Sequence, residues 1–235
     1  MRKKTVITPV CSGLAILAGS FSFLGDAQAV TLLSEDFEGG VNIFGASTYN
    51  YASGYTLANL LTPGGGLQYM KGGPGINGSV STNTFSAGSI NLLTGGITGG
   101  DIDGGIVNYN LYAQFSSYLT QGDHATLSVQ FLDAGSLALG SPLQLGGDAF
   151  TAALPTGAIG NYTDAKAWGA DSLAGIVPSG ARFATVQIFD VKTAGGTAID
   201  GYMDNVNFSI AVPEPGALTL FALGGGLAAL ARRRR

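Results

Sequence analysis

Several stretches of the chain alternate apolar and polar residues with a period of two, the pattern of a β-strand that buries one face. The clearest are 108–115, 126–131, 184–188 and 205–210. Glycine supplies 38 of the 235 residues and gathers between such stretches, for example at Gly72-Gly73-Pro74-Gly75 and Gly146-Gly147, as expected for turns. No convincing helical stripe free of Gly and Pro appears, and only 163–174 has room for a helical turn. The sequence predicts one all-β domain over residues 30–211, a β-sandwich of the jelly-roll kind.

The amino-terminal 29 residues have the three parts of a secretory signal peptide. Arg2-Lys3-Lys4 is the positive region, residues 6–24 are mostly apolar, and Ala27-Gln28-Ala29 is a small-residue cleavage site. Signal peptidase is therefore an expected partner, and the mature chain is expected to begin near Val30. The single cysteine, Cys11, lies in this segment, so the mature chain can form neither a disulfide nor a Cys-based site.

The carboxyl terminus joins a rigid tripeptide, a short apolar helix and a block of cations. Residues 217–231 would span about 22 Å of a hydrocarbon core roughly 30 Å thick, which makes them a marginal membrane anchor. The four terminal arginines, Arg232, Arg233, Arg234 and Arg235, act as a stop-transfer signal and favour a cytoplasmic position. Pro213, Glu214 and Pro215 then lie on the outer face in an extended, protease-accessible form. An ordinary tail anchor with a chance Pro-Glu-Pro is the alternative.

These residues resemble the PEP-CTERM sorting signal of Gram-negative bacteria, over residues 212–235. The resemblance implies that a membrane-embedded exosortase recognises Pro213-Glu214-Pro215 and removes the tail. The protein would then be held only transiently in the inner membrane before it reaches the cell surface or extracellular matrix. It also implies a setting of exopolysaccharide production, which makes exopolysaccharide a candidate partner.

The expected mature domain is acidic. Residues 30–211 contain four basic and 13 acidic residues, a net charge of −9. The four cations are scattered, so they cannot form the basic stripe that follows a phosphate backbone, and nucleic acid is excluded as a partner. A negative surface does suit the recruitment of divalent cations.

The two ends of this domain resemble the terminal strands of galactose-binding-like and carbohydrate-binding jelly rolls. The matching residues are Glu35-Asp36-Phe37-Glu38 and the segment 199–206. The resemblance implies that these strands are neighbours and that a structural calcium ion joins them. Carboxylates are suitable calcium ligands, and the candidates are Glu35, Asp36, Glu38, Asp200 and Asp204. Solvated turn charges are the alternative, because the spacing is not that of a dense calcium loop.

A carbohydrate site needs a flat aromatic ring with polar partners. Trp168, the only tryptophan, and the nearby Tyr162 are the candidates, although a lone tryptophan is commonly a core residue.

No catalytic residue is predicted. His124 is the only histidine and is expected in an exposed turn, no Gly-x-Ser-x-Gly motif is present, and no pair of acids stands out for glycoside hydrolysis. Asp101 and Asp103, between glycine pairs, are expected in an exposed loop. The sequence thus favours a non-enzymatic carbohydrate- or matrix-binding module. A secreted polysaccharide hydrolase and a purely structural surface protein are the alternatives.

Overall fold

The computed structural model describes residues 28–38, 42–46, 48–50, 68–118, 120–156, 166–193 and 195–213. Contacts group Ala27–Glu214 into one compact unit. Its strands and helices are β1 Gln28–Glu35, β2 Thr48–Asn50, β3 Gln68–Pro74, β4 Ser81–Asn91, α1 Gly99–Asp103, β5 Asn108–Ser117, β6 His124–Leu132, β7 Leu143–Gly146, α2 Gly147–Ala153, β8 Gly169–Ile176, β9 Phe183–Lys192 and β10 Ala198–Val212. Within this described part, neither helix has the length and hydrophobicity needed to cross a bilayer.

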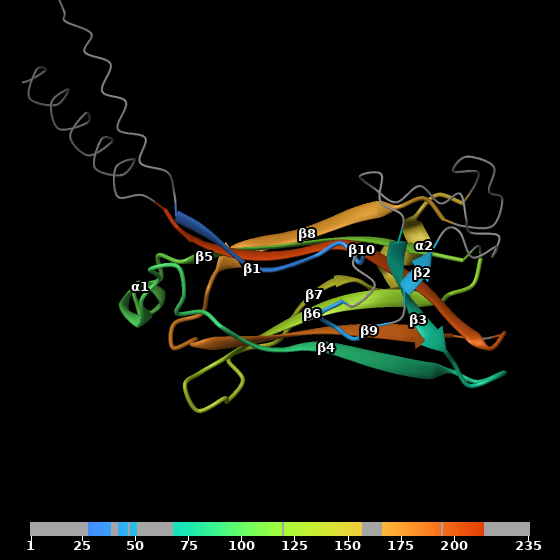
Figure 1. Ribbon diagram of the computed structural model, residues 1–235, viewed down its shortest axis with the longest axis horizontal. Helices are drawn as coiled ribbons and strands as arrows, with labels where there is room; N and C mark the ends of the chain where they lie inside the picture. Colours follow the sequence, from blue (N-terminus) through green and yellow to red (C-terminus); the bar gives the residue numbers. More distant parts are fainter. Residues whose placement is uncertain are drawn as a thin grey trace, which may run out of the picture. The chain divides into compact units, whose positions relative to one another are not determined.

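The strands form two antiparallel sheets that lie face to face as two layers (Figure 1). One sheet has the order β2-β3-β10-β5-β8, with β1 also paired to β10, and the other has the order β4-β9-β6-β7. The pairings are nested along the chain: β3 with β10, β4 with β9, β5 with β8 and β6 with β7. This nesting is that of one long hairpin rolled into two sheets, and it confirms the predicted jelly-roll sandwich.

The core lies between the two sheets. The strands predicted from alternation each send one row of side chains inward, and β9 alternates without a break from Phe183 to Lys192. Leu111, Phe115 and Phe208 from one sheet are fully buried, as are Leu127 and Ile188 from the other. Burying each such side chain contributes about 1.5–3 kcal/mol relative to leaving it in water.

Three local predictions were wrong. Gly72, Gly73 and Pro74 belong to β3 and not to a turn. A Cβ on Gly72 would lie 2.6 Å from both Asp190 Cγ and Ile199 Cγ2, so glycine serves close packing here. The segment expected to allow a helical turn contains β8 from Gly169 onward. Two short helices, α1 and α2, form where none was expected.

The sandwich has two ends that differ in content. At the exit end β10 finishes at Val212, β1 begins at Gln28, and α1 lies close by. At the pocket end β10 begins, β5 finishes at Ser117, and α2 follows β7. Figure 1 shows α1 and α2 at opposite ends of the sheets. Gly201 pairs with Ser117 and Ala211 with Asn108, and the nine residue steps from Asn108 to Ser117 along β5 place the two pairs roughly 30 Å apart.

Candidate functional site

The segment predicted to direct sorting follows the last strand directly. β10 ends at Val212, and the next residue, Pro213, is exposed. Glu214, Pro215, the apolar segment 217–231 and the terminal arginines Arg232, Arg233, Arg234 and Arg235 lie outside the described residues, as do residues 1–27 of the predicted signal peptide. The tripeptide therefore begins with no linker between it and the sheet.

The first and last strands are neighbours, as the resemblance implied, and they bring four of the five predicted calcium ligands together. β1 pairs with the second half of β10, with Glu35 opposite Val206. Burial, together with the negative charges of Glu38, Asp36 and Glu35, raises the pKa of Asp204 to about 7. The side chain of Asp204 is only 1% exposed. An ionised Asp204 is therefore disfavoured unless a positive charge compensates it.

The three carboxylates around Asp204 already accept backbone hydrogen bonds. Glu35 accepts from the N–H groups of Phe37 and Ile43, both at 2.9 Å. Glu38 Oε1 accepts from the Gln68 N–H at 2.8 Å, and Asp36 Oδ1 from the Glu38 N–H at 3.1 Å. These bonds shape the turn after β1. Within the described ranges, no three side chains of His, Cys, Asp or Glu are arranged so that they could hold a metal ion.

Asp200, the fifth predicted ligand, lies in a different acidic group at the pocket end. Its Oδ1 accepts a hydrogen bond from the Tyr202 hydroxyl at 3.2 Å, and its backbone N–H donates to Asp123 Oδ2 at 3.1 Å. Burial raises the pKa of Asp200, and the charge of Asp123 adds to the rise. The other oxygen of Asp123, Oδ1, accepts from the N–H and the hydroxyl of Thr193.

Asp190 completes this second group. It is fully buried, and neither carboxylate oxygen has a hydrogen-bond partner. Burial raises the pKa of Asp190 well above its usual value, with further contributions from Asp123 and Asp200. The nearby Gly201 backbone N–H partly opposes this rise. Sequence reasoning missed Asp190, although the inward row of Ala184, Val186 and Ile188 continues to it with the same period of two.

Trp168 packs mainly within the domain. Its ring meets Tyr69 edge-on at a centroid distance of 5.7 Å, and Tyr69 meets Tyr202 in the same way at 5.3 Å. The indole Nε1 is buried and has no hydrogen-bond partner, and the residue as a whole is half-buried. Tyr162, its predicted companion, lies outside the described residues. This arrangement is closer to the core alternative than to an open stacking platform for a sugar.

A cavity of about 290 Å³ opens at the pocket end, between α2 and the connection from β5 to β6. Its described lining residues are Thr120, Gln121, Gly122, Asp148, Thr151, Ala152, Thr156 and Lys166. Lys166 is 6% exposed, and its Nζ donates to the Thr151 carbonyl at 2.7 Å. Three separate chain segments build this cavity, so the sequence alone gave no signal for it.

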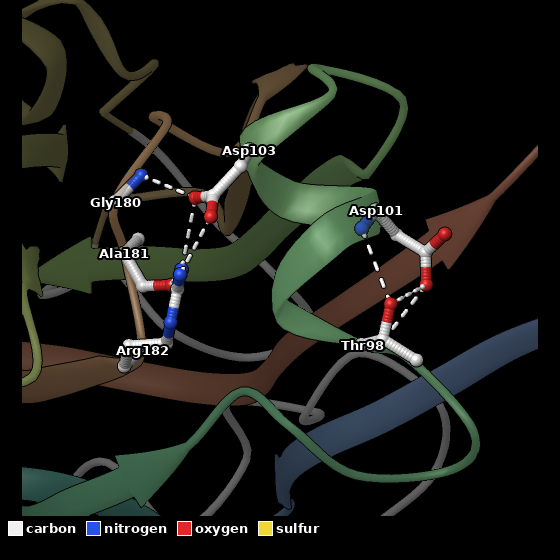
Figure 2. Close-up of polar contacts among 6 residues, drawn as sticks. All are labelled: Thr98, Asp101, Asp103, Gly180, Ala181 and Arg182. Carbon is white, nitrogen blue, oxygen red and sulfur yellow. Dashed lines mark hydrogen bonds and ion pairs between the residues drawn. The ribbon is translucent and has the colours of Figure 1, made fainter.

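At the exit end of the sandwich the acidic side chains have hydrogen-bond and ion-pair partners. Asp101 and Asp103, expected in a loop, lie in α1, where Thr98 and Asp101 form a capping box (Figure 2). Arg182 donates from Nη1 and Nη2 to the two oxygens of Asp103, at 3.0 and 2.7 Å, and the Gly180 N–H also donates to Asp103. Figure 2 shows this fork joining α1 to the residues before β9. These acids have a structural role.

His124, the only histidine, is half-buried as the first residue of β6. Its Nδ1 lies 2.9 Å from the Gly122 carbonyl oxygen. A ring nitrogen at this distance from a carbonyl acts as the donor, so His124 closes the turn before the strand.

Several solved structures resemble the fold. A carbohydrate-binding module 27 of Caldicellulosiruptor saccharolyticus in complex with mannohexaose is 18% identical with a TM-score of 0.38, over 77% of this chain and 97% of that one. A carbohydrate-binding module 61 in complex with β-1,4-galactotriose is 12% identical with a TM-score of 0.39, over 76% and 97%. A structure of the carbohydrate-binding and catalytic modules of Clostridium thermocellum xylanase 10B is 19% identical with a TM-score of 0.35. The match covers 76% of this chain and 28% of that chain. Likeness at this level does not transfer a ligand.

No curated protein sequence matches the chain. A family model described as the PEP-CTERM protein-sorting motif matches residues 211–235. The matched region therefore includes the last two residues of β10, Ala211 and Val212. The match includes the tripeptide, the apolar segment and the arginine block singled out above. The carboxyl terminus of this chain is a PEP-CTERM protein-sorting motif, which indicates export and sorting to the cell surface.

Proposed function

We propose that the chain is an exported surface or extracellular-matrix protein whose β-sandwich is a non-enzymatic carbohydrate- or matrix-binding module. The sorting motif at residues 211–235 is the observation that supports this proposal most strongly. Signal peptidase would remove the amino-terminal segment, and an exosortase would remove the tail after a transient stay in the inner membrane. Exopolysaccharide would be the ligand met at the destination.

The two ends of the sandwich support a binding role. The chain leaves the domain at Val212, and the cavity lies at the opposite end of the sheets. Processing at the tail therefore need not disturb the cavity.

A hydrolase needs two carboxylates that can reach a substrate, one of them with a raised pKa to act as the acid. The two acids with the most strongly raised pKa values, Asp190 and Asp204, are 0% and 1% exposed. Neither can protonate a glycosidic oxygen from its buried position. This observation favours the binding module over the polysaccharide-acting hydrolase.

We include a structural calcium ion in the proposal, held near Glu35, Asp36, Glu38 and Asp204. The charge arrangement supports it, because a buried carboxylate beside three others would be stabilised by a divalent cation. The oxygens as placed do not yet enclose an ion, and Asp200 would not take part. Calorimetry at pH 8 tests this: added calcium should raise the melting temperature of the protein and not that of Asp204→Asn. Equal melting temperatures in calcium and in chelator would remove calcium from the account.

Two measurements test the function itself. The intact mass of the protein from host cells should lack the tail when exosortase is present and retain it when the enzyme is deleted. Retention on immobilised polysaccharides, including the host's own exopolysaccharide, should exceed that on uncoated resin. A mass that retains residues 216–235 in both strains would contradict sorting. Absence of retention on every polysaccharide would leave only the structural alternative.

A further inference from the structure

Lys166 is the least compensated cation in the described part of the chain. Arg182 has a carboxylate partner in Asp103, and Lys71 lies near Asp200, whose charge acts on it. Lys192 is fully buried and donates to two backbone carbonyls, those of Ile76 and Ser79. The ammonium of Lys166 donates to one carbonyl only, that of Thr151.

The lack of further acceptors for the Lys166 ammonium matters because the residue is only 6% exposed to water. An ammonium group has three N–H donors, and burying it without a counter-charge is costly. No carboxylate of the described residues pairs with it, since the ion pair in that part of the chain is Arg182 with Asp103. Because Lys166 lines the cavity, an anion that entered the cavity would compensate its buried charge.

The other residues that line the cavity indicate which kind of anion would fit it. Thr120, Gln121 and Thr156 supply neutral polar groups, and Thr151 has a buried Oγ1 with no hydrogen-bond partner. Asp148, which is exposed on the wall, would repel a bare anion but can accept hydrogen bonds from hydroxyl groups. The walls therefore suit a ligand that carries one carboxylate and several hydroxyls.

Size gives the last constraint. A volume of about 290 Å³ lies at the lower limit of pockets that enclose a small ligand, which leaves room for one sugar ring and not for a chain. We infer that this cavity binds one uronic acid residue of an acidic saccharide, with Lys166 donating to the sugar carboxylate and Asp148 accepting from its hydroxyls. This inference rests on the proposed carbohydrate-binding function and names its ligand class.

Calorimetric titration of the protein purified from host cells tests the inference. The ligands are trisaccharides of galacturonate and glucuronate, the matching neutral trisaccharides of galactose and glucose, and acetate as a carboxylate without hydroxyls. Short saccharides are chosen because the acidic domain would repel a long polyanion. We expect the uronates to bind more tightly than their neutral counterparts, and acetate to bind more weakly than either uronate.

Two substitutions locate the site. Lys166→Met keeps the length of the side chain and should weaken uronate binding about 10- to 100-fold, the effect of losing a hydrogen bond to a charged group. Thr151→Val has the same shape without the hydroxyl and serves if Lys166→Met fails to fold; it should weaken uronate binding by a smaller factor. Arg182→Gln removes one positive charge at the exit end and is the matched control, with unchanged binding expected.

The outcomes separate the two proposals. If neutral and acidic trisaccharides bind equally and the variants change neither, the uronate site is wrong while carbohydrate binding stands. If no saccharide binds, both proposals fail. If Arg182→Gln weakens uronate binding as much as Lys166→Met does, the effect is long-range charge and the assigned cavity is wrong.

Discussion

The two ends of the sandwich treat polar groups in opposite ways. At the exit end Asp103 is exposed and Asp101 is half-buried, and both carboxylates accept hydrogen bonds. Asp101 accepts from the backbone N–H and the hydroxyl of Thr98, and Asp103 accepts from the Gly180 N–H and the Arg182 guanidinium. At the pocket end Asp190, Ser117, Thr151 and the indole of Trp168 each have a buried polar atom without a hydrogen-bond partner. Lys166 is buried there with a single carbonyl acceptor for its ammonium.

Buried polar atoms without partners lower stability, so a fold keeps few of them. One of them, Thr151 Oγ1, belongs to a residue that lines the cavity, as expected if this end has the proposed binding role. At the exit end, by contrast, the hydrogen bonds of Asp103 join α1 to Gly180 and Arg182, in the connection that precedes β9. The proposed binding role and the hydrogen-bonded acids thus lie at opposite ends of the sandwich, roughly 30 Å apart.

The largest expected effect compares one glycine from each end. Gly146 has φ of 75° and ψ of −133°, and a Cβ there would lie 2.5 Å from Phe115 Cε1. Gly105 has φ of 68°, with nothing within 4 Å of a Cβ. Gly146→Ala should cost at least about 2 kcal/mol, and Gly105→Ala about 1 kcal/mol, in urea unfolding. Equal costs would mean that the pocket end is not tightly packed around Gly146.

Asp190→Asn tests the buried acid at the pocket end. The pKa of Asp190 is raised in the folded protein, so the native state holds a proton that the unfolded chain releases. The stability that Asp190 contributes is thus greatest at low pH and is lost as pH rises from about 4 towards the folded pKa. We expect Asp190→Asn to melt higher than the parent, by a margin that grows from pH 5 to pH 8. A variant that melts lower at pH 8 would show that the carboxylate is compensated.

Asp204→Asn should have a similar but smaller effect that ends at a defined pH. Burial and the neighbouring carboxylates raise the pKa of Asp204 to about 7, so the parent protein in chelator should lose stability as pH rises from about 4 to about 7 and should lose no more above that. The variant should lose less stability over the same pH interval. Each kcal/mol of difference between the two proteins should appear as roughly 2–4 °C in melting temperature. Identical melting curves from pH 5 to pH 8 for both proteins would contradict the assigned protonation.

Asp103→Asn at the exit end should have the smallest effect and the opposite sign. The Arg182 guanidinium holds the pKa of Asp103 below its usual value. Its contribution is therefore present at neutral pH and is lost as pH falls through the folded pKa. We expect a slight loss of melting temperature at pH 7 that shrinks in high salt, because the pair is exposed. A large, salt-independent loss would show that the exit end also depends on buried charge.

Strands β5, β6, β9 and β10 were predictable, because their alternation of apolar and polar residues reflects one buried face. β8 was not, since it is an edge strand whose exposed positions break the alternation. β3 was not, because Gly72 and Gly73 serve close packing against Asp190 and Ile199, and the sequence does not distinguish that role from a turn. The sorting motif was predictable because it is contiguous in sequence.

The site depends on contacts between distant segments, and sequence gave only part of it. The neighbouring first and last strands placed Glu35 and Asp204 near each other, as the resemblance implied. Asp190 could have been found by extending the inward row of β9. Lys166 could not, because its burial comes from α2 and the end of β5.

The separation of roles is tested most directly by an NMR titration of the isotopically labelled protein with galacturonate trisaccharide. The account predicts that amide shifts change around Gly122, Thr151 and Lys166, and that those around Thr98, Asp103 and Arg182 stay unchanged. Changes centred on the exit end, or none at saturating ligand, would contradict it.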